Sequence, residues 1–309
     1  MTQASPILFT LVIAARDAEK YIRETLEGLT RIRDEPFRVI VVNDGSSDAT
    51  AEIAEAFRQA NPVIEMQFVN GPARGVSAAR NLGLSLVVSE FVVFLDADDL
   101  LAEDALPRFR KALADPQSIA AVGQVLRIDQ DGAPLLSPDN RDLVPEEDQL
   151  YGLVKKNFIV NGGALAIRTA VAKAVSGYDE TLKYGEDWEF WCRLLTQGSV
   201  STVEGGHVLA YRQIASGANH TAASKPFARD ITCLDVVAKN DAMRRQLGWR
   251  LGPALRMRRI DIFWSGVRTM YQYESKRSAL MLSALGLLVY PDSLARPKLA
   301  LRLLKSVRK

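Results

Sequence analysis

The chain has 309 residues, of which 48% are hydrophobic and 25% are charged. This ordinary globular composition excludes a disordered chain, a collagen-like repeat and a disulfide-rich scaffold, and the length predicts one large domain or two modest ones. The net charge is only +2, but residues 240–309 carry 15 Lys and Arg against 4 Asp and Glu, whereas residues 1–239 have a net charge of −9. An acidic body with a basic C-terminal region predicts an anionic partner for that region.

The sequence favours a cytoplasmic protein. Two cysteines, Cys192 and Cys233, are too few for a disulfide framework or a cysteine-based zinc site. The first apolar run, 7–15, has no basic segment before it and is interrupted at once by charged residues, so it predicts a strand rather than a signal peptide. The uncharged run 278–290 has 13 residues, fewer than the roughly 20 of a membrane-spanning helix.

Apolar runs alternate with helical patterns over the first hundred residues, which predicts a parallel sheet covered on both faces. The predicted strands are 9–14, 38–43, 64–69 and 91–95. The predicted helices are 19–29, 48–60 with Asp48 as its N-cap, and 77–88. Because ligands bind at the carboxyl ends of the strands in such sheets, the residues just after each strand are the candidates for a site.

After residue 115 the alternation is less regular. Two further strands are predicted at 120–128 and 164–168, with a loop rich in Pro and Asp between them that reaches residue 145. A helix is predicted over 186–196, and an apolar run at 208–210 leads into Tyr211-Arg212. From residue 226 onward the chain is predicted to form helices rich in Arg.

Three carboxylates lie within four residues at the end of the fourth predicted strand, as Asp96-Ala97-Asp98-Asp99. These carboxylates repel one another, and burying them without compensation is costly. Mg²⁺ and Mn²⁺ prefer oxygen ligands and would remove this cost, so the cluster predicts a divalent metal site. The alternative is a solvated loop in which Asp99 caps a helix.

Asp44 follows the second predicted strand, within Asn43-Asp44-Gly45-Ser46-Ser47-Asp48. In other nucleotide-binding α/β folds, a carboxylate at such a position accepts hydrogen bonds from a base or a ribose hydroxyl. Turn formation and helix capping are the alternative for an acid beside a Gly/Ser turn. The two acidic strand ends together predict one shared site.

With these motifs in place, the sequence resembles the family 2 glycosyltransferases, inverting enzymes of the GT-A fold, over about residues 8–215. Order and spacing of the motifs agree with that family. The segments that carry the resemblance are Leu11-Val12-Ile13-Ala14-Ala15-Arg16-Asp17, Val41-Val42-Asn43-Asp44-Gly45-Ser46-Ser47-Asp48, Gly75-Val76-Ser77-Ala78-Ala79-Arg80-Asn81-Leu82-Gly83, Phe94-Leu95-Asp96-Ala97-Asp98-Asp99 and Gly185-Glu186-Asp187-Trp188-Glu189-Phe190.

The resemblance implies an α/β architecture of the GT-A type. A Rossmann-like nucleotide-binding half, 1–115, and an acceptor-binding half, 116–224, would share one mixed, largely parallel sheet. Together they form a glycosyltransferase domain over 1–224. A basic helical extension, 225–309, would follow this domain.

The resemblance also implies roles for individual residues. Asp44 would contact the nucleoside of the donor, and Asp98 would be the metal ligand in the Asp-x-Asp motif. Asp187 would be the general base that takes a proton from the acceptor hydroxyl. The other donor-binding residues would be Ala15, Asp17, Gly75, Arg80, Asp96 and Ala97, and Arg80 has the alternative of pairing with the acidic cluster.

Further residues have weaker support. His220 would bind the metal or the diphosphate, with an ordinary surface histidine as the alternative. Arg212 belongs to a Tyr-Arg pair that the family often has at this point, and Trp188 could stack on a sugar. Glu186 precedes Asp187, and both have the alternative of simple acidity in the first turn of a helix.

The end of the basic region shows a periodic pattern. Lys298, Arg302, Lys305 and Lys309 fall on one face of a predicted helix. A basic amphipathic helix is typical of membrane surfaces, so we expect peripheral attachment to the cytoplasmic face of an anionic membrane. Nucleic acid is not expected as a partner, because the chain has no RNA-binding aromatic motif or recognition-helix pattern. The alternative is a solvated face packed on the acidic body.

Together these observations predict a metal-assisted inverting glycosyltransferase. It would move a sugar from a nucleoside-diphosphate donor, with UDP favoured, to a hydroxyl of a lipid-linked or cell-surface glycan acceptor. A sugar nucleotidyltransferase is an alternative, but it needs a Gly-rich phosphate loop where this chain has Ala14-Ala15-Arg16-Asp17. A non-catalytic carbohydrate or membrane adaptor is another alternative, which the intact Asp96, Asp98 and Asp187 oppose.

Overall fold

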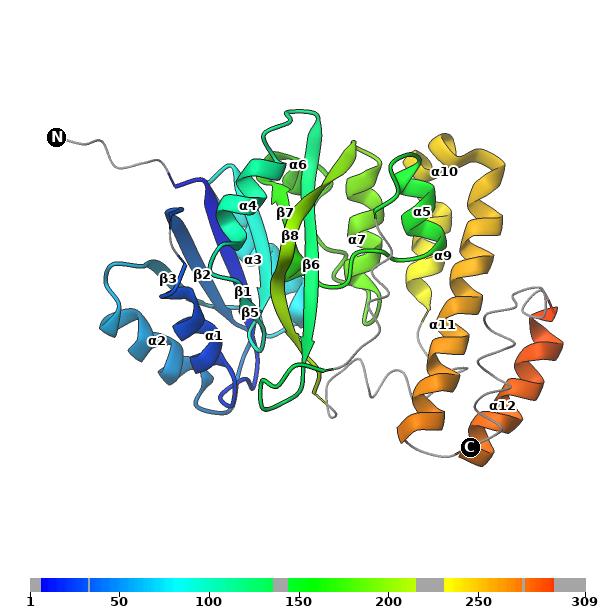
Figure 1. Ribbon diagram of the computed structural model, residues 1–309, viewed down its shortest axis with the longest axis horizontal. Helices are drawn as coiled ribbons and strands as arrows, with labels where there is room; N and C mark the ends of the chain where they lie inside the picture. The colour runs from blue at the N-terminus through cyan, green and yellow to red at the C-terminus, as the bar shows by residue number, and fades with distance from the viewer. Residues whose placement is uncertain (1–6, 33, 136–143, 215–230, 274–275, 292–309) are drawn as a thin grey trace.

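The computed structural model describes residues 7–32, 34–135, 144–214, 231–273 and 276–291, and its centre is one eight-stranded sheet (Figure 1). The strand order across the sheet is β3-β2-β1-β4-β7-β6-β8-β5. The strands are β1 (Phe9–Ala15), β2 (Phe37–Asn43), β3 (Glu65–Asn70), β4 (Phe91–Asp96), β5 (Leu100–Leu101), β6 (Ser118–Ile128), β7 (Leu165–Arg168) and β8 (Ser199–Arg212).

The directions of the strands bring most of their carboxyl ends to one edge. Strands β1 to β4 are parallel, β7 runs antiparallel to both β4 and β6, and β8 is parallel to β6. The first four strands, β6 and β8 therefore end at the same edge, where β7 begins. The chain reverses its strand order between β1 and β4, and ligands in open α/β sheets bind at such a switch point.

Helices cover both faces of the sheet, which is why its central strands are apolar on both sides. Within β1, Val12 faces one hydrophobic cluster, whereas Leu11 and Ile13 face the other. One face is covered by α1 (Ile22–Leu29), α2 (Thr50–Ala60) and α4 (Ala105–Ala112). The other face is covered by α3 (Val76–Leu86), α5 (Gln149–Lys155), α6 (Thr169–Ala174) and α7 (Glu186–Leu195).

The C-terminal helices extend the second of these layers (Figure 1). They are α9 (Thr232–Lys239), α10 (Asp241–Leu247), the 3₁₀ turn η2 (Gly248–Arg250), α11 (Leu251–Tyr273) and α12 (Lys276–Val289). Leu234, Met243 and Ala254 belong to the same cluster as Trp188 of α7, and the guanidinium of Arg258 lies 5.3 Å from the centre of the Trp188 ring. Helices α9 to α11 thus share the hydrophobic cluster that α5 and α7 form on this face of the sheet.

Helix α12 lies on the far side of α11 from the sheet and packs against α11 through a small cluster of its own (Figure 1). The members of that cluster include Phe263 and Trp264 of α11 and Ala279 of α12. Within the described part of the chain, no helix is both long and apolar enough to cross a membrane.

The predicted strands and helices of the first hundred residues all form, within a few residues of the expected limits. The first helix begins at Ile22 rather than residue 19. Asp48 is not the N-cap of α2, which is Ala49; the Asp48 carboxylate accepts hydrogen bonds from the amides of Thr50 and Glu19 instead. The elements that the sequence did not predict are β5, α4, α5, the 3₁₀ turn η1 (Gly162–Ala164), α6 and the first half of β8.

Candidate active site

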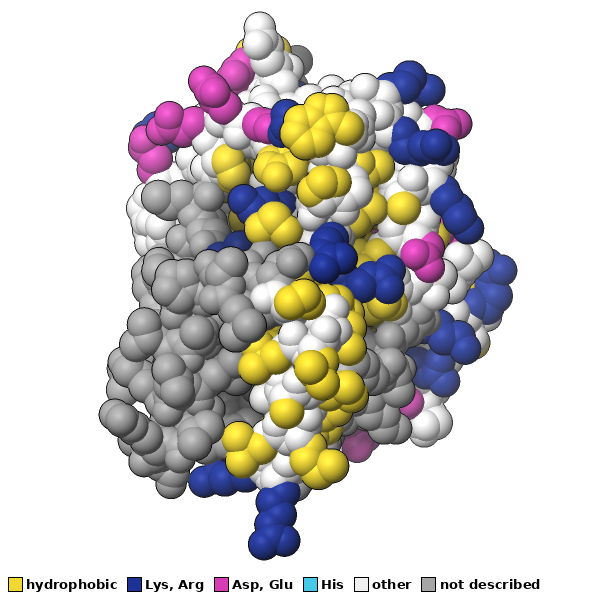
Figure 2. Space-filling view, turned by 90° about the vertical axis from the view of Figure 1, so that its right-hand side faces the viewer, with side chains coloured by type: hydrophobic (Ala, Val, Ile, Leu, Met, Phe, Trp, Pro, Cys, Tyr) yellow, Lys and Arg dark blue, Asp and Glu magenta, His cyan; other side chains and the backbone are white. Residues whose placement is uncertain are grey.

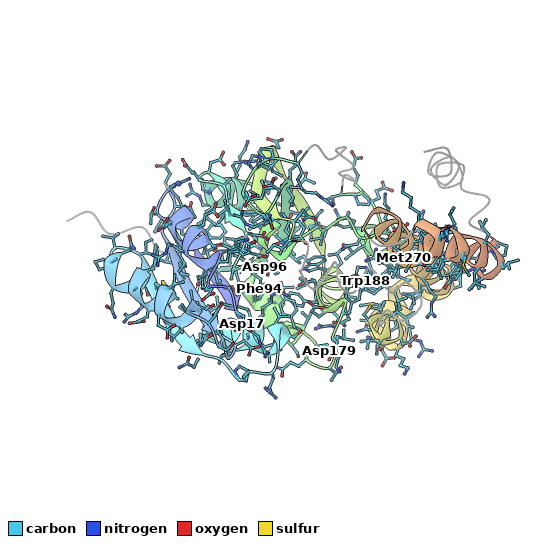
Figure 3. All side chains as sticks on the ribbon, turned by 90° about the horizontal axis from the view of Figure 1, so that it is seen from below. Asp17, Phe94, Asp96, Asp179, Trp188 and Met270 are labelled. Carbon is cyan, nitrogen blue, oxygen red and sulfur yellow. The ribbon has the colours of Figure 1, made fainter. Side chains whose placement is uncertain are left out.

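Polar side chains gather at the edge where the parallel strands end. Figure 3 views the molecule from below, onto this edge, with Asp17 and Asp96 over the sheet and Trp188 toward the C-terminal helices. The contributing segments are the ends of β1, β2, β4 and β8, the start of β7 and the first turns of α3 and α7. Their arrangement fulfils the expectation that the acidic strand ends lie at one edge of the sheet.

The acidic loop after β4 presents three carboxylates whose oxygens lie within 4.8 Å of one another, those of Asp96, Asp98 and Asp99. Asn161, which precedes β7, donates a hydrogen bond to Asp99 over 2.8 Å and to Asp96 over 3.2 Å. No side chain of the described residues donates to the Asp98 carboxylate. Burial, with the charge of Asp96, raises the pKa of Asp98 to about 6. A carboxylate so placed gains from a nearby cation, so the donor set suits a divalent metal.

Asp99 and Arg212 fix the shape of this loop. Asp99 is fully buried, and its second oxygen accepts a hydrogen bond from the amide of Arg212 over 2.8 Å. The guanidinium of Arg212 donates to the carbonyl oxygen of Asp98 and to the carboxylate of Glu24 on α1. Arg212 therefore joins the end of β8 to the acidic loop, and Asp99 does not cap a helix.

Arg80 of α3 connects the acidic loop with the predicted base. Its guanidinium donates one hydrogen bond to Asp96 over 2.7 Å and another to Asp187 over 2.8 Å. The Arg80 side chain is 5% exposed, whereas those of Asp96 and Asp187 are 33% and 32% exposed. The ring of Tyr178 lies 5.1 Å from the guanidinium and closes its other side. The structure thus shows Arg80 pairing with the acidic residues, the alternative that the sequence left open.

Asp187 lies in the first turn of α7, beside Arg80. Burial raises the pKa of Asp187 to about 7, with Arg80 opposing the rise and Glu186 and Asp96 adding to it. The helix begins after Gly185, whose φ of +77° and contact with Cys233 exclude a side chain, since a Cβ would lie 2.6 Å from the Cys233 Sγ. A carboxylate with a pKa near 7 is suited to accept a proton at neutral pH.

Asp44 shapes the loop that leads into α3. It is 2% exposed, and its two carboxylate oxygens accept hydrogen bonds from the amides of Gly75, over 2.7 Å, and Arg74, over 3.2 Å. Gly75 has a φ of +105°, a conformation that favours glycine. The contact between Asp44 and Gly75 therefore sets where α3 begins, and this fixes the position of Arg80 within the helix.

The end of β1 makes contacts within the same edge. The carbonyl oxygen of Ala15 accepts a hydrogen bond from the amide of Asp44 over 2.8 Å. The Asp17 carboxylate accepts one from the amide of Ser47 over 2.8 Å. The backbone of Ala97 accepts one from the hydroxyl of Thr25 over 3.0 Å. These bonds join the loop after β1 to that after β2, and helix α1 to the loop after β4.

The structure does not support the expectation for Trp188, and it does not describe His220. Trp188 does not offer its ring to a sugar: it is 2% exposed, and its indole N–H donates to the carbonyl oxygen of Leu153 within the core. His220 lies outside the described residues, as do Lys298, Arg302, Lys305 and Lys309.

Asn161 is the site residue that the sequence analysis missed. Its signal was the Asn161-Gly162-Gly163 turn before β7, in which a Cβ on Gly162 would lie 3.0 Å from the carbonyl oxygen of Phe94. The absence of a side chain there lets this turn approach β4 closely enough for Asn161 to reach Asp96 and Asp99.

Solved structures define the class to which the fold belongs. A mannosyltransferase, PcManGT from Pyrobaculum calidifontis in complex with GDP-Man and Mn²⁺, superposes with a TM-score of 0.61 at 17% identity, covering 98% of this chain and 86% of that one. S. aureus TarS 1-349 in complex with UDP-GlcNAc superposes with a TM-score of 0.56 at 17% identity, covering 84% and 81%. The architecture is therefore that of the GT-A glycosyltransferases.

The family follows from the sequence comparison. The model of glycosyl transferase family 2 matches residues 10–175, more than half of the chain, so the chain belongs to family 2 of the glycosyltransferases. A relative, the minor teichoic acid biosynthesis protein GgaA of Bacillus subtilis, is 28% identical over 61% of this chain and 43% of its own length. Four curated relatives, GgaA among them, are covered over only 16% to 60% of their lengths.

Proposed function

We propose that the chain is an inverting glycosyltransferase that moves a sugar from a nucleoside-diphosphate donor to an acceptor hydroxyl. The observation that carries this proposal is the Arg80 bridge. It joins Asp96 of the Asp-x-Asp motif to Asp187, so that a leaving-group site and a basic carboxylate lie on either side of one guanidinium. Direct displacement with inversion requires this pair of functions, a leaving-group site and a separate base.

The donor is bound at the acidic loop. Asp98, with Asp96, would hold Mg²⁺ or Mn²⁺, and such an ion would neutralise the charge that develops on the departing diphosphate. Asn161 and Arg212 keep these carboxylates in place through the hydrogen bonds described above. The PcManGT complex contains GDP-Man and Mn²⁺, and the TarS complex contains UDP-GlcNAc. Both neighbours support a nucleotide-sugar donor, and TarS supports UDP for this chain.

The nucleoside lies over the ends of β1 and β2. Ala15 and Asp17 form one side of this pocket, and the loop that Asp44 holds at Gly75 forms the other. Both Asp44 oxygens accept backbone hydrogen bonds. Each carboxylate oxygen has a second lone pair, so Asp44 can also accept a hydrogen bond from a base N–H or a ribose hydroxyl. Ala97, which follows Asp96 at the end of β4, would border the same nucleoside site.

Asp187 acts as the general base. Its pKa of about 7 leaves about half of the population deprotonated at neutral pH, and a carboxylate of this pKa is a stronger base than an exposed aspartate. Arg80 holds the Asp187 carboxylate on the side of the acidic loop, where the anomeric carbon of a bound donor would lie. Glu186 adds negative charge that keeps this pKa high.

The acceptor is a lipid-linked or cell-surface glycan. The relative GgaA is named for minor teichoic acid biosynthesis, and another relative, from Staphylococcus epidermidis, is named a teichoic acid poly(glycerol phosphate) polymerase. The basic C-terminal region, with its excess of 11 positive charges over residues 240–309, fits an anionic membrane that carries such an acceptor.

The test is a donor assay followed by a binding assay. A panel of UDP-, GDP- and dTDP-sugars is screened for hydrolysis with and without Mn²⁺, and titration calorimetry then measures the affinity for the matching nucleoside diphosphate. We expect metal-dependent turnover of one donor and loss of metal-dependent binding in Asp98→Ala. Binding that is unchanged in Asp98→Ala would remove the metal assignment, and full transfer by Asp187→Asn would remove the base.

A further inference from the structure

Helix α12 packs on α11 through its small residues. Ala279 is 1% exposed and Gly286 is also buried, and the ring of Phe263 lies so close to Gly286 that a Cβ there would meet its Cε1 at 2.3 Å. Small residues on the inner face let the two helices approach closely. Leu282, Leu287 and Tyr290 pack against the same cluster beside these small residues.

The outward face of α12 is apolar. At positions spaced three and four apart, large hydrophobic side chains point away from α11, and Met281 and Leu288 are 75% and 79% exposed. We name this surface the α12 apolar face. It consists of Leu280, Met281, Ala284, Leu285, Leu288 and Val289. Figure 2 looks at this side of the molecule and shows hydrophobic side chains running down its lower half.

An ordinary surface helix turns polar residues outward, whereas α12 is apolar both toward α11 and on its outward face. Contiguous exposed apolar surface of this kind marks an interaction site, whereas single exposed residues elsewhere, such as Val63, need no explanation. The α12 apolar face thus requires an occupant.

The charges around the face identify its occupant. No acidic residue occurs between 275 and 291, and Arg277 at the start of the helix is exposed. Dark blue Lys and Arg side chains lie at the upper and lower ends of the hydrophobic strip in Figure 2. An apolar face flanked by cations matches an anionic lipid surface, where acyl chains take the apolar residues and headgroups take the cations.

We propose that the α12 apolar face inserts into the interface of an anionic membrane, with the helix axis parallel to the bilayer. The 14 residues of α12 rise by about 1.5 Å each, or about 21 Å in total, which is short of the roughly 30 Å hydrocarbon core and suits a helix that lies on the surface. Membrane binding by α12 does not depend on the proposed function. Only its biological role, which is to bring the enzyme to a lipid-borne acceptor, rests on that function.

The experiment compares two double variants of the full chain. Met281→Glu/Leu288→Glu places two acidic residues on the α12 apolar face. Val63→Glu/Val88→Glu is the matched control, because these valines are 92% and 79% exposed and lie outside the α12 apolar face, so that total charge changes equally. Binding is measured by co-sedimentation with vesicles of phosphatidylcholine that contain phosphatidylglycerol, and with vesicles of phosphatidylcholine alone.

We expect the wild type and the control to bind the vesicles that contain phosphatidylglycerol, and the α12 variant to bind at least about tenfold more weakly, since burial of one large apolar side chain alone corresponds to such a factor. Equal binding by all three proteins overturns the proposal. Light scattering that shows a wild-type dimer and a monomeric α12 variant also overturns it, in favour of a second copy on this face.

Hydrolysis of the nucleotide sugar without lipid separates this proposal from the proposed function. We expect all three proteins to hydrolyse the donor at the same rate, since α12 is remote from the acidic loop (Figure 1). Loss of vesicle binding with unchanged hydrolysis supports the membrane surface. A wild type that binds vesicles but turns over no donor overturns the proposed function and leaves the membrane surface standing.

Discussion

Replacing Arg80 by Met tests the link between the acidic loop and Asp187. Arg80 is the cation that lowers the pKa of Asp187 against the effect of burial, and it donates to that carboxylate over 2.8 Å. An opposite charge at this distance lowers a carboxylate pKa by about 1–3 units. In Arg80→Met the pKa of Asp187 should therefore rise above 7 by that amount.

The base works deprotonated, so the rate of the wild type should rise with pH through a midpoint near 7, and in Arg80→Met this midpoint should move upward. At pH 7 the deprotonated fraction of Asp187 falls from about one half to between about 1/11 and 1/1000, so transfer should fall by about 5- to 500-fold and recover in part at alkaline pH. The variant should also lose about 1–3 kcal/mol of unfolding free energy, less than for a fully buried pair because both carboxylates are a third exposed.

The assay is the pH profile of kcat with saturating donor and metal. Arg58→Met is the control, because Arg58 lies in α2 and pairs with Glu55 at the surface, where its side chain is 43% exposed. It removes the same charge without touching Asp187. A profile in Arg80→Met with the wild-type midpoint would refute the reasoning, whatever the size of the loss in rate.

Four further outcomes follow from the contacts described. Asp187→Asn should lower transfer by about 100- to 10,000-fold while calorimetric donor affinity stays near that of the wild type. Asp98→Ala should abolish the Mn²⁺ dependence of nucleotide binding in the same measurement. Asn161→Ala should lower the unfolding free energy in urea by about 1–3 kcal/mol, because Asp99 keeps its burial and loses a donor. Gly286→Ala should destabilise the fold in thermal unfolding, although helix propensity alone predicts a gain of about 1 kcal/mol, since its Cβ meets Phe263.

The sheet could be predicted from local patterns because its strands are buried on both faces. Runs such as Val39–Val42 are continuous in apolar character, and the polar residues that end them lie where the chain leaves the sheet. The same rule placed Asp44, Asp96 and Asp98 at one edge. The positions of Asp44, Asp96 and Asp98 follow from the parallel direction of the strands, which the alternation of strands and helices predicts.

The remaining parts depend on contacts between residues distant in sequence. Arg80 and Asp187 are brought together only when α3 and α7 pack on the same face of the sheet, so the sequence left the role of Arg80 open. The sequence allows Trp188 to stack on a sugar, because an aromatic residue beside an acid has the same local pattern whether its ring is buried or exposed. Helix α12 was read as an uncharged run, and only its packing on α11 shows which side chains face outward.

The stacking of Arg258 on Trp188 has a consequence for recombination between relatives. Trp188 follows Asp187 directly, and α11 covers its ring with a cation, while burial lowers the pKa of that guanidinium. A chimaera joined at residue 225 would graft foreign helices onto a tryptophan with no matching partner. Exchange of α7 together with α9 to α11 preserves the contact between Arg258 and Trp188. A segment exchanged between relatives should therefore include α7, the helix that carries Asp187.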